Sequence, residues 1–259
     1  MRRICSTIAV LLLMLSGQLT NAQQARESYQ LTVYHFNSPE QEKAIDGYLK
    51  SAYIPAVRKN GIKDVGVFKL IANDTATDKR IYVLIPLKKI EDISTLSPAQ
   101  LVDQQNLQNG KDYLDAPFSN VPYLRIENIV LKAFELAPKM SLPKLSAAKT
   151  DRIYELRSYE GGTEKLFRNK VEMFNQGGEI KLFERLNFNA VFYAEVLSGS
   201  RMPNLMYMTS FESREDRDAH WKTFGNDPEW KKLSALPQYQ KNVSKIDIML
   251  LTAAEYSDY

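Results

Sequence analysis

Two similar segments lie 125 residues apart in this chain, and the repeat constrains the fold more than any other feature. Tyr29–Tyr34 (YQLTVY) returns as Tyr154–Tyr159 (YELRSY). Both segments alternate large and polar residues, which is typical of a strand with one buried face. A chain that repeats one unit can bury a shared core between its two copies.

The elements expected after each segment repeat as well. Each copy continues with a helical pattern, two strand patterns, a second helical region and a closing apolar strand. In the first copy the helical pattern and the three strand patterns cover residues 41–60, 65–70, 81–87 and 124–134. In the second copy they cover residues 164–186, 190–196, 205–211 and 243–251. Each copy therefore has the order β-α-β-β-α-β of a ferredoxin-like unit.

A ferredoxin-like unit forms an antiparallel sheet with helices on one face, and its other face needs a cover. A second copy of the same unit provides that cover. We therefore predict an α+β fold in which two tandem ferredoxin-like units pack as an α/β-barrel pseudo-dimer. The predicted boundaries are a divergent first unit at 23–135, a linker at 136–151 and a second unit at 152–259.

The first 22 residues have the pattern of a bacterial-type signal peptide. Arg2 and Arg3 precede the apolar run Ile8–Leu15, and small residues end the segment near Ala22. This run is too short for the roughly 20 residues that a membrane span requires. We expect cleavage near Ala22 and export to the periplasm or the medium. Because Cys5 is the only cysteine, the mature chain is expected to lack disulfides, thiolate metal sites and cysteine nucleophiles.

The charge balance argues against nucleic acid as a partner. The chain has 34 basic and 31 acidic residues, and loss of Arg2 and Arg3 leaves 32 basic residues against the same 31. Nucleic-acid binders concentrate basic residues in a stripe or patch, and no long basic stripe remains here. No later segment is apolar enough to span a membrane.

Residues 212–230 (ESREDRDAHWKTFGNDPEW) predict two capped helices in succession. Ser213 followed by Asp216 nearly matches a capping box. Asp227 followed by Pro228 is typical of a second helix start, because proline costs nothing at the first helical position. The stretch is therefore explained by helix structure without any catalytic role.

The same stretch holds both tryptophans of the chain. Arg217, Trp221 and Phe224 are spaced so that they share one face of the first predicted helix. Trp230 is expected to face inward from the second helix. Packing is the expected role of both tryptophans, since buried aromatic residues usually contribute core contacts.

Several ordered motifs of the second copy resemble the NIPSNAP family. They are RIYELRSY at 152–159, the segment 213–219 and DPEW at 227–230, and the similarity covers roughly residues 152–255. The first copy resembles the same fold more loosely and lacks the DPEW signature. The resemblance implies the dimeric α/β-barrel fold, whose superfamily includes cofactor-free monooxygenases and haem-degrading enzymes. It does not imply a reaction, because function resides in a site rather than in a fold.

His220 occupies the helix that supplies an iron ligand in haem-handling relatives of this barrel. Those relatives also use an asparagine on the first strand and a tryptophan on the third, where this sequence has Arg157 and Tyr207. His220 is therefore expected to be a surface or helix-packing residue rather than an iron ligand. The repeat position of His35 is Glu160, so the two histidines do not form a symmetric metal site. No metal and no cofactor are predicted.

The best candidate for a ligand site is a cleft between the sheet and the helices of the second copy. A guanidinium on a strand is costly unless it is paired or directed at an anion. For Arg157 an ion pair with Glu195 or another neighbouring carboxylate is the alternative. The predicted ligand-binding set comprises Arg157, Tyr159, Tyr207, Arg217, His220 and Trp221. The stretch 198–200, followed by Arg201, is either a plain turn or a loop that closes over a ligand.

The sequence shows no nucleophile elbow, zinc-protease helix, phosphate-binding loop or dinucleotide fingerprint. We therefore expect an exported NIPSNAP-type protein of undefined activity that binds a small organic ligand or a protein partner through its barrel. The alternative is a cofactor-independent enzyme of the monooxygenase or isomerase type, which can use Tyr, Arg and His in an apolar cavity. A third reading is a structural protein that assembles through its edge strands. Homo-oligomers beyond the internal pair stay open.

Overall fold

A computed structural model describes residues 25–97, 101 and 104–259. The predicted signal peptide at 1–22 lies outside the described residues. In the described part of the chain, no helix has the length and apolar character that a membrane crossing needs.

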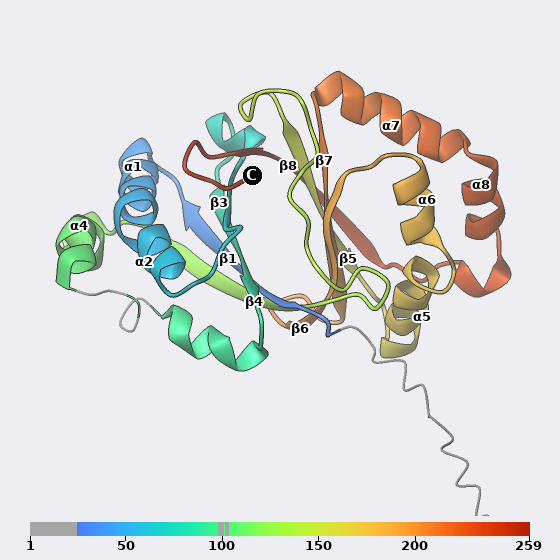
Figure 1. The fold of residues 1–259 in the computed structure, drawn as a ribbon, viewed down its shortest axis with the longest axis horizontal. Helices are drawn as coiled ribbons and strands as arrows, with labels where there is room; N and C mark the ends of the chain where they lie inside the picture. The colour runs from blue at the N-terminus through green and yellow to red at the C-terminus, as the bar shows by residue number, and fades with distance from the viewer. Residues whose placement is uncertain (1–24, 98–100, 102–103) are drawn as a thin grey trace, which may run out of the picture.

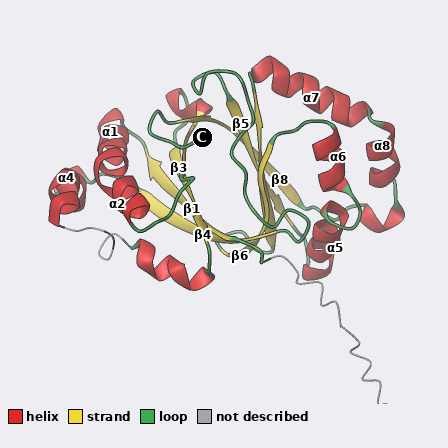
Figure 2. Cartoon of the chain, viewed as in Figure 1, coloured by secondary structure: helices red, strands yellow, loops and turns green. Residues whose placement is uncertain are grey.

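The first half of the chain forms four strands with helices between them (Figures 1 and 2). Its strands are β1 (Ser28–Phe36), β2 (Gly66–Leu70), β3 (Lys79–Leu87) and β4 (Arg125–Ala133). Its helices are α1 (Pro39–Tyr48), the π-helical turn η1 (Leu49–Tyr53), α2 (Ile54–Lys59) and α4 (Gln104–Leu114). Short 3₁₀ turns lie at η2 (Ile71–Asp74), η3 (Ile90–Leu96) and η4 (Phe118–Asn120).

The second half repeats this order. Its strands are β5 (Ile153–Glu160), β6 (Ala190–Ser198), β7 (Asn204–Phe211) and β8 (Lys245–Ala253). Its helices are α5 (Glu164–Phe174), α6 (Glu179–Arg185), α7 (Arg214–Asn226) and α8 (Pro228–Ser234), followed by the 3₁₀ turn η5 (Pro237–Tyr239). Each predicted strand is present within a few residues of its expected bounds.

The two helices predicted as continuous are interrupted in the structure. The one expected at 41–60 changes to a π-helical turn at Leu49–Tyr53 before it resumes as α2. The one expected at 164–186 is divided into α5 and α6 by a turn that ends at Gly178, whose φ is +93°. That backbone conformation is favourable only for glycine, so the position ends one helix and starts the next.

All eight strands join in one closed barrel in the order β1-β3-β2-β8-β5-β7-β6-β4. Within each half the order is that of a ferredoxin-like sheet, and the halves meet where β2 pairs with β8 and β4 pairs with β6. The predicted tandem barrel is therefore confirmed, although the sheets join edge to edge as well as face to face. Every neighbouring pair is antiparallel. Because strand directions alternate around the barrel, β1 and β5 run the same way and end at the same mouth.

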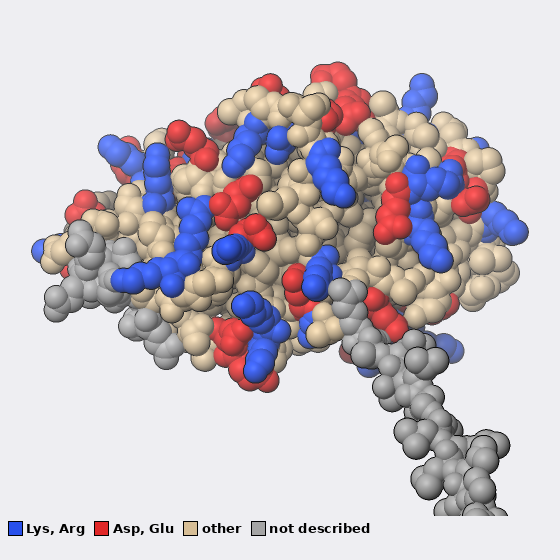
Figure 3. Space-filling view, viewed as in Figure 1, with Lys and Arg blue, Asp and Glu red and all other residues tan. Residues whose placement is uncertain are grey.

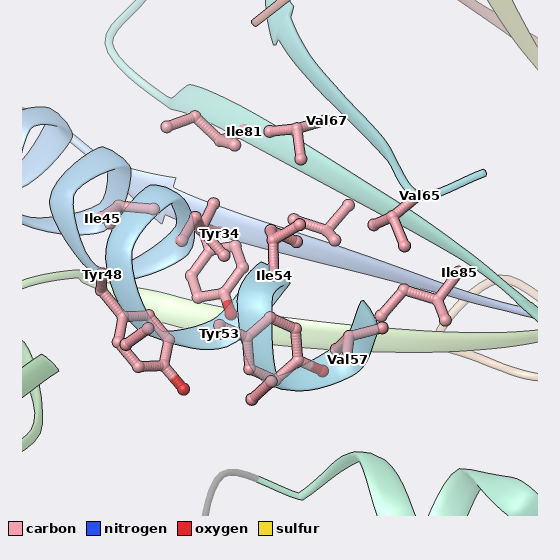
Figure 4. Packing of buried hydrophobic residues seen from close by; sticks show 14 of the residues in the cluster. Tyr34, Ile45, Tyr48, Tyr53, Ile54, Val57, Val65, Val67, Ile81 and Ile85 are labelled. Atoms are coloured by element: carbon pink, nitrogen blue, oxygen red, sulfur yellow. The ribbon is translucent and has the colours of Figure 1, made fainter. Parts of the chain in front are cut away.

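Three hydrophobic clusters fill the molecule in layers. One lies between the first sheet and its helices, where Tyr34 and Ile85 of the strands pack against Ile45, Ile54 and Val57 (Figure 4). A matching cluster lies between the second sheet and α5–α8. The third fills the barrel interior with residues from both halves, and burial of this shared apolar surface stabilises the closed form.

Charged side chains of both signs alternate on the face shown in Figure 3 rather than gathering into one patch. This distribution agrees with the near balance of basic and acidic residues in the sequence.

Candidate functional site

A buried carboxylate organises the predicted residues of the second half. Glu155 on β5 has no exposed surface. It accepts hydrogen bonds from Arg157 Nε at 2.5 Å, from Arg217 Nε at 2.5 Å and from Trp221 Nε1 at 2.7 Å. The Arg157 guanidinium also lies 3.7 Å from the centre of the Trp221 ring. The carboxylate thus joins β5 to α7 through two cations and an indole N–H.

The network extends along the strand through two phenols. Arg157 Nη1 donates to the Tyr159 hydroxyl at 3.0 Å, and the hydroxyls of Tyr159 and Tyr207 lie 2.9 Å apart. Of the two alternatives considered for Arg157, the ion pair with a neighbouring carboxylate is present, but the carboxylate is Glu155. Glu195 instead pairs with Arg26 at 2.7 Å.

The electrostatics of this network favour the charged forms. Burial would raise the pKa of Glu155, but the Arg217 and Arg157 guanidiniums hold it below its usual range. Burial would likewise lower the pKa of Arg157, yet Tyr207, Tyr159 and Glu155 raise it. Burial also raises the pKa of Tyr207, which stays a neutral phenol. Glu155 and Arg157 therefore form a permanent ion pair beneath α7.

His220 lies on the same helix but outside this network. Its Nδ1 donates to the Asp216 backbone oxygen at 2.9 Å, and its ring packs against Phe188 and Phe211. Five of the six predicted site residues thus contact one another. The sixth, His220, packs against residues outside this network. Whether any of the six binds a ligand stays a prediction.

The two helices predicted for residues 212–230 have the expected caps. Ser213 Oγ accepts from Asp216 N at 3.2 Å, and Asp227 accepts from Glu229 N at 3.0 Å and Trp230 N at 3.2 Å. Their rings pack as expected, because Trp221 and Trp230 both contact Phe224. This stretch positions α7 over β5 and needs no catalytic explanation.

A cavity of about 80 Å³ lies elsewhere, inside the barrel at the mouth where β1 and β5 end. We call it the barrel-mouth cavity. Its apolar wall is formed by Val33, Ile129, Val196, Met206 and Met249. Its polar residues are His35, Arg80, Tyr82, Arg125, Glu127, Ser158, Ser200, Arg201 and Asn204, with Gly199 completing the lining. Both halves of the chain contribute, so the cavity exists only because the barrel is closed.

The opposite end of the barrel interior is filled. Tyr259 is fully buried there, with its ring 5.4 Å from that of Phe68 and 6.3 Å from that of Tyr154. A ligand therefore reaches the interior cavity from the mouth that holds His35.

The polar rim is built by strand register. His35 is the cross-strand partner of both Arg80 on β3 and Arg125 on β4. Asp78, just before β3, accepts from Arg80 Nη2 at 2.6 Å and lies 2.7 Å from His35 Nδ1. Arg201, from the loop between β6 and β7, pairs with Asp247 across the rim. Residues 199–201 line the cavity, and whether this stretch is a plain turn or a loop that closes over a ligand stays a prediction.

Two buried polar atoms on cavity residues have no hydrogen-bond partner among the described residues. They are the Tyr82 hydroxyl and Asn204 Oδ1, on residues that are 3% and 2% exposed. Burial raises the pKa of Tyr82, and the nearby Arg80 guanidinium opposes that rise. A buried polar atom without a partner costs about 1–3 kcal/mol, and both atoms belong to side chains of the cavity lining.

Sequence reasoning did not select the rim residues. His35 was considered only as half of a metal site, and Arg80, Tyr82 and Arg125 carry no motif. The only sequence signal for these residues is that His35, Arg80 and Arg125 each lie at or next to the end of a predicted strand. Using that signal requires knowing which strands pair, which the repeat alone does not give.

Comparison with known proteins identifies the second half. Residues 154–258 match the family model described as NIPSNAP. This part of the chain is a NIPSNAP domain. The resemblance drawn from RIYELRSY and DPEW is therefore confirmed, and the first half lies outside the match. No curated protein is similar enough to the chain to count as a match.

Solved structures place the NIPSNAP domain and its partner unit in a wider fold group. A candidate monooxygenase from Lactobacillus acidophilus NCFM has a TM-score of 0.57 and 9% identity, covering 88% of this chain and 94% of its own. A candidate monooxygenase from Fusobacterium nucleatum subsp. nucleatum has a TM-score of 0.54 and 8% identity, covering 89% and 93%. At this identity the likeness shows the two-unit barrel fold alone.

Single-unit NIPSNAP structures match only part of the chain. An uncharacterised NIPSNAP-like domain protein from Burkholderia xenovorans has a TM-score of 0.38 and 17% identity. It covers 42% of this chain and 91% of its own.

Proposed function

We propose that the protein binds a small organic molecule in the barrel-mouth cavity. The observation that carries this proposal is a mostly apolar hollow shared by both halves of the chain, with a few polar side chains at its rim. Ligand sites typically combine an apolar wall with a few polar groups that fix orientation. The volume of about 80 Å³ is below the roughly 150 Å³ of a closed cavity that holds benzene, so a ring-sized ligand would lie partly in the mouth.

The Glu155 network is the weaker candidate for this role. Its polar groups already satisfy one another, and α7 covers the carboxylate completely. Its geometry supports attachment of α7 to the sheet, which is a structural task. The proposal therefore assigns binding to the cavity shared by both units.

Ligand-observed NMR with a set of small aromatic compounds tests the proposal. We expect the wild-type protein to bind members such as 4-nitroanisole and the variant Met249→Phe to lose them, because the larger side chain fills the cavity. Met140→Phe is the matched control, since Met140 is also partly buried against the interior cluster but does not line the cavity. If Met249→Phe binds as well as wild type, or if no compound of the set binds wild type, the proposal is wrong.

We also propose that the protein is exported. The proposal is supported only by the amino-terminal pattern of Arg2, Arg3 and the apolar run Ile8–Leu15. The mass of the protein from fractionated producing cells tests it. We expect a chain shortened by about 22 residues outside the cytoplasm, whereas an intact chain in the cytoplasm would contradict export.

A further inference from the structure

His35 is a buried histidine at the polar end of the barrel-mouth cavity, and its two ring nitrogens have different partners. The residue is 3% exposed. Its Nδ1 lies 2.7 Å from Asp78 Oδ1. An ionised carboxylate only accepts hydrogen bonds, so Nδ1 carries the proton that it donates to Asp78. In the neutral ring, this leaves Nε2 as the nitrogen that accepts.

Arg125 is consistent with the same tautomer. One of its terminal nitrogens lies 3.2 Å from Nε2 and 3.3 Å from Nδ1. A guanidinium only donates, and Nδ1 is already committed to Asp78, so Nε2 is the nitrogen that accepts. The Arg125 side chain is 58% exposed and pairs with Glu127 at 3.0 Å, so a ligand O–H that reaches Nε2 takes the place of the Arg125 contact. Glu127 Oε2, at 3.7 Å from Nε2, is too distant for a hydrogen bond.

Asp78 is held in place as a partner of the histidine. Its second oxygen accepts from Arg80 Nε at 3.0 Å and Nη2 at 2.6 Å. Burial would raise the pKa of Asp78, but the hydrogen bonds from His35 and Arg80 lower it, so the carboxylate stays ionised. The carboxylate therefore fixes the ring and stabilises the imidazolium that forms when Nε2 takes a proton.

We infer that His35 accepts a proton from a weakly acidic ligand, an enol or a phenol, bound in the barrel-mouth cavity. The ligand O–H bond breaks, the proton moves to Nε2, and the electron pair stays on the ligand oxygen as an enolate or phenolate. Arg125 then lies beside the new anion. No oxidant or reductant takes part in this step. Asp78 is a positioning residue, and the inference rests on the proposed binding function.

Two probes of similar shape separate binding from proton transfer. 4-Nitrophenol gives a yellow anion, whereas 4-nitroanisole has no proton to lose. We expect bound 4-nitrophenol to show a phenolate-to-phenol ratio about tenfold above that of the free compound at the same pH, equivalent to one pKa unit. His35→Gln should remove this rise, whereas the binding of 4-nitroanisole by the wild-type protein reports separately whether the cavity takes a ring of this size. Asp78→Asn should reduce the rise in the same way, and because the Asp78 side chain is 44% exposed, this second variant leaves the buried ring of His35 in place.

Three other outcomes of these measurements are possible, and each has a different consequence for the inference and for the proposed function. If wild type binds 4-nitrophenol only as the neutral phenol, the inference is overturned and the proposed function stands. If Glu127→Gln removes the phenolate band while His35→Gln keeps it, Glu127 is the proton acceptor and the inference is wrong. If wild type binds neither probe, the proposed function fails and the inference falls with it.

Discussion

At the scale of single residues, Glu155 is the group whose environment is most demanding. It has no exposed surface and still carries a charge, which is tolerated because Arg157, Arg217 and Trp221 all donate to it. Part of this arrangement could be predicted from the sequence. Residues 155, 157 and 159 alternate onto one face of a strand, so the carboxylate two residues before Arg157 was within reach. That Arg217 and Trp221 meet the same carboxylate depends on where α7 packs, which the strand pattern does not contain.

Glu155→Gln should lower the free energy of unfolding by about 3–5 kcal/mol, because it takes the buried carboxylate away from two partly buried guanidiniums. Urea denaturation measures this change. Glu255→Gln is the control, since Glu255 is 89% exposed and pairs with the exposed Lys50 at 3.4 Å. We expect the control to leave stability unchanged. A loss in Glu155→Gln no larger than in the control would show that the network does not stabilise the fold.

The lowered pKa of Glu155 predicts how the stability of the protein depends on pH. Its folded pKa is below the value near 4.3 of an unperturbed glutamate, so the unfolded state binds the proton more readily. Its contribution to stability is therefore complete above about pH 4.3 and is lost as the pH falls through the folded pKa. Urea unfolding measured from neutral to acidic pH should show wild type losing more stability over this window than Glu155→Gln. Parallel curves for the two proteins would contradict this assignment.

At the scale of elements, helix caps were the most predictable feature. Ser213 and Asp227 begin α7 and α8 as their spacing indicated, since capping depends only on residues three positions apart. The break between α5 and α6 was missed, although Gly177 and Gly178 mark it in the sequence. A glycine inside a helical pattern is compatible with either outcome, and here the positive φ of Gly178 decides it.

Ser213→Ala should destabilise the protein by about 1 kcal/mol, because Asp216 N loses its capping acceptor at the start of α7. Ser213→Asp should restore most of the loss, since aspartate caps equally well and favours the helix amino terminus. Thermal unfolding of the three proteins measures both effects. Ser234→Ala, at the carboxyl end of α8, is the matched control and should change stability little. If Ser213→Asp is as unstable as Ser213→Ala, the cap does not explain the effect.

At the scale of the whole molecule, the repeat in the sequence predicted the barrel but not the residues that line the barrel-mouth cavity. Similar units were enough to infer a shared interior, because each has one sheet face without helices. The barrel-mouth cavity depends instead on positions where the units differ. In β1 the mouth position is His35, opposite Arg80 and Arg125, whereas β5 has Glu160 there, opposite Asn204 and Lys245. The cross-strand register that joins such residues follows from the closed barrel and not from the order of the elements.

The shared interior also predicts that the two halves unfold together. Leu31 of the first half is fully buried in the cluster that contains Tyr154 and Leu156 of the second. Leu31→Ala should cost about 2–5 kcal/mol. Both tryptophans lie in the second half, so their fluorescence reports that half alone.

We expect the fluorescence and circular dichroism transitions of Leu31→Ala to shift together to lower urea concentration, because loss of the interior contacts removes the cover of both sheets. Leu142→Ala is the control, since Leu142 is 43% exposed and its truncation should leave both transitions in place. A fluorescence transition that stays at the wild-type midpoint, while the circular dichroism signal gains an earlier phase, would mean that the second unit is stable without the first. In that case the barrel-mouth cavity would open whenever the first unit unfolded, and ligand binding would be lost before the tryptophan signal changed.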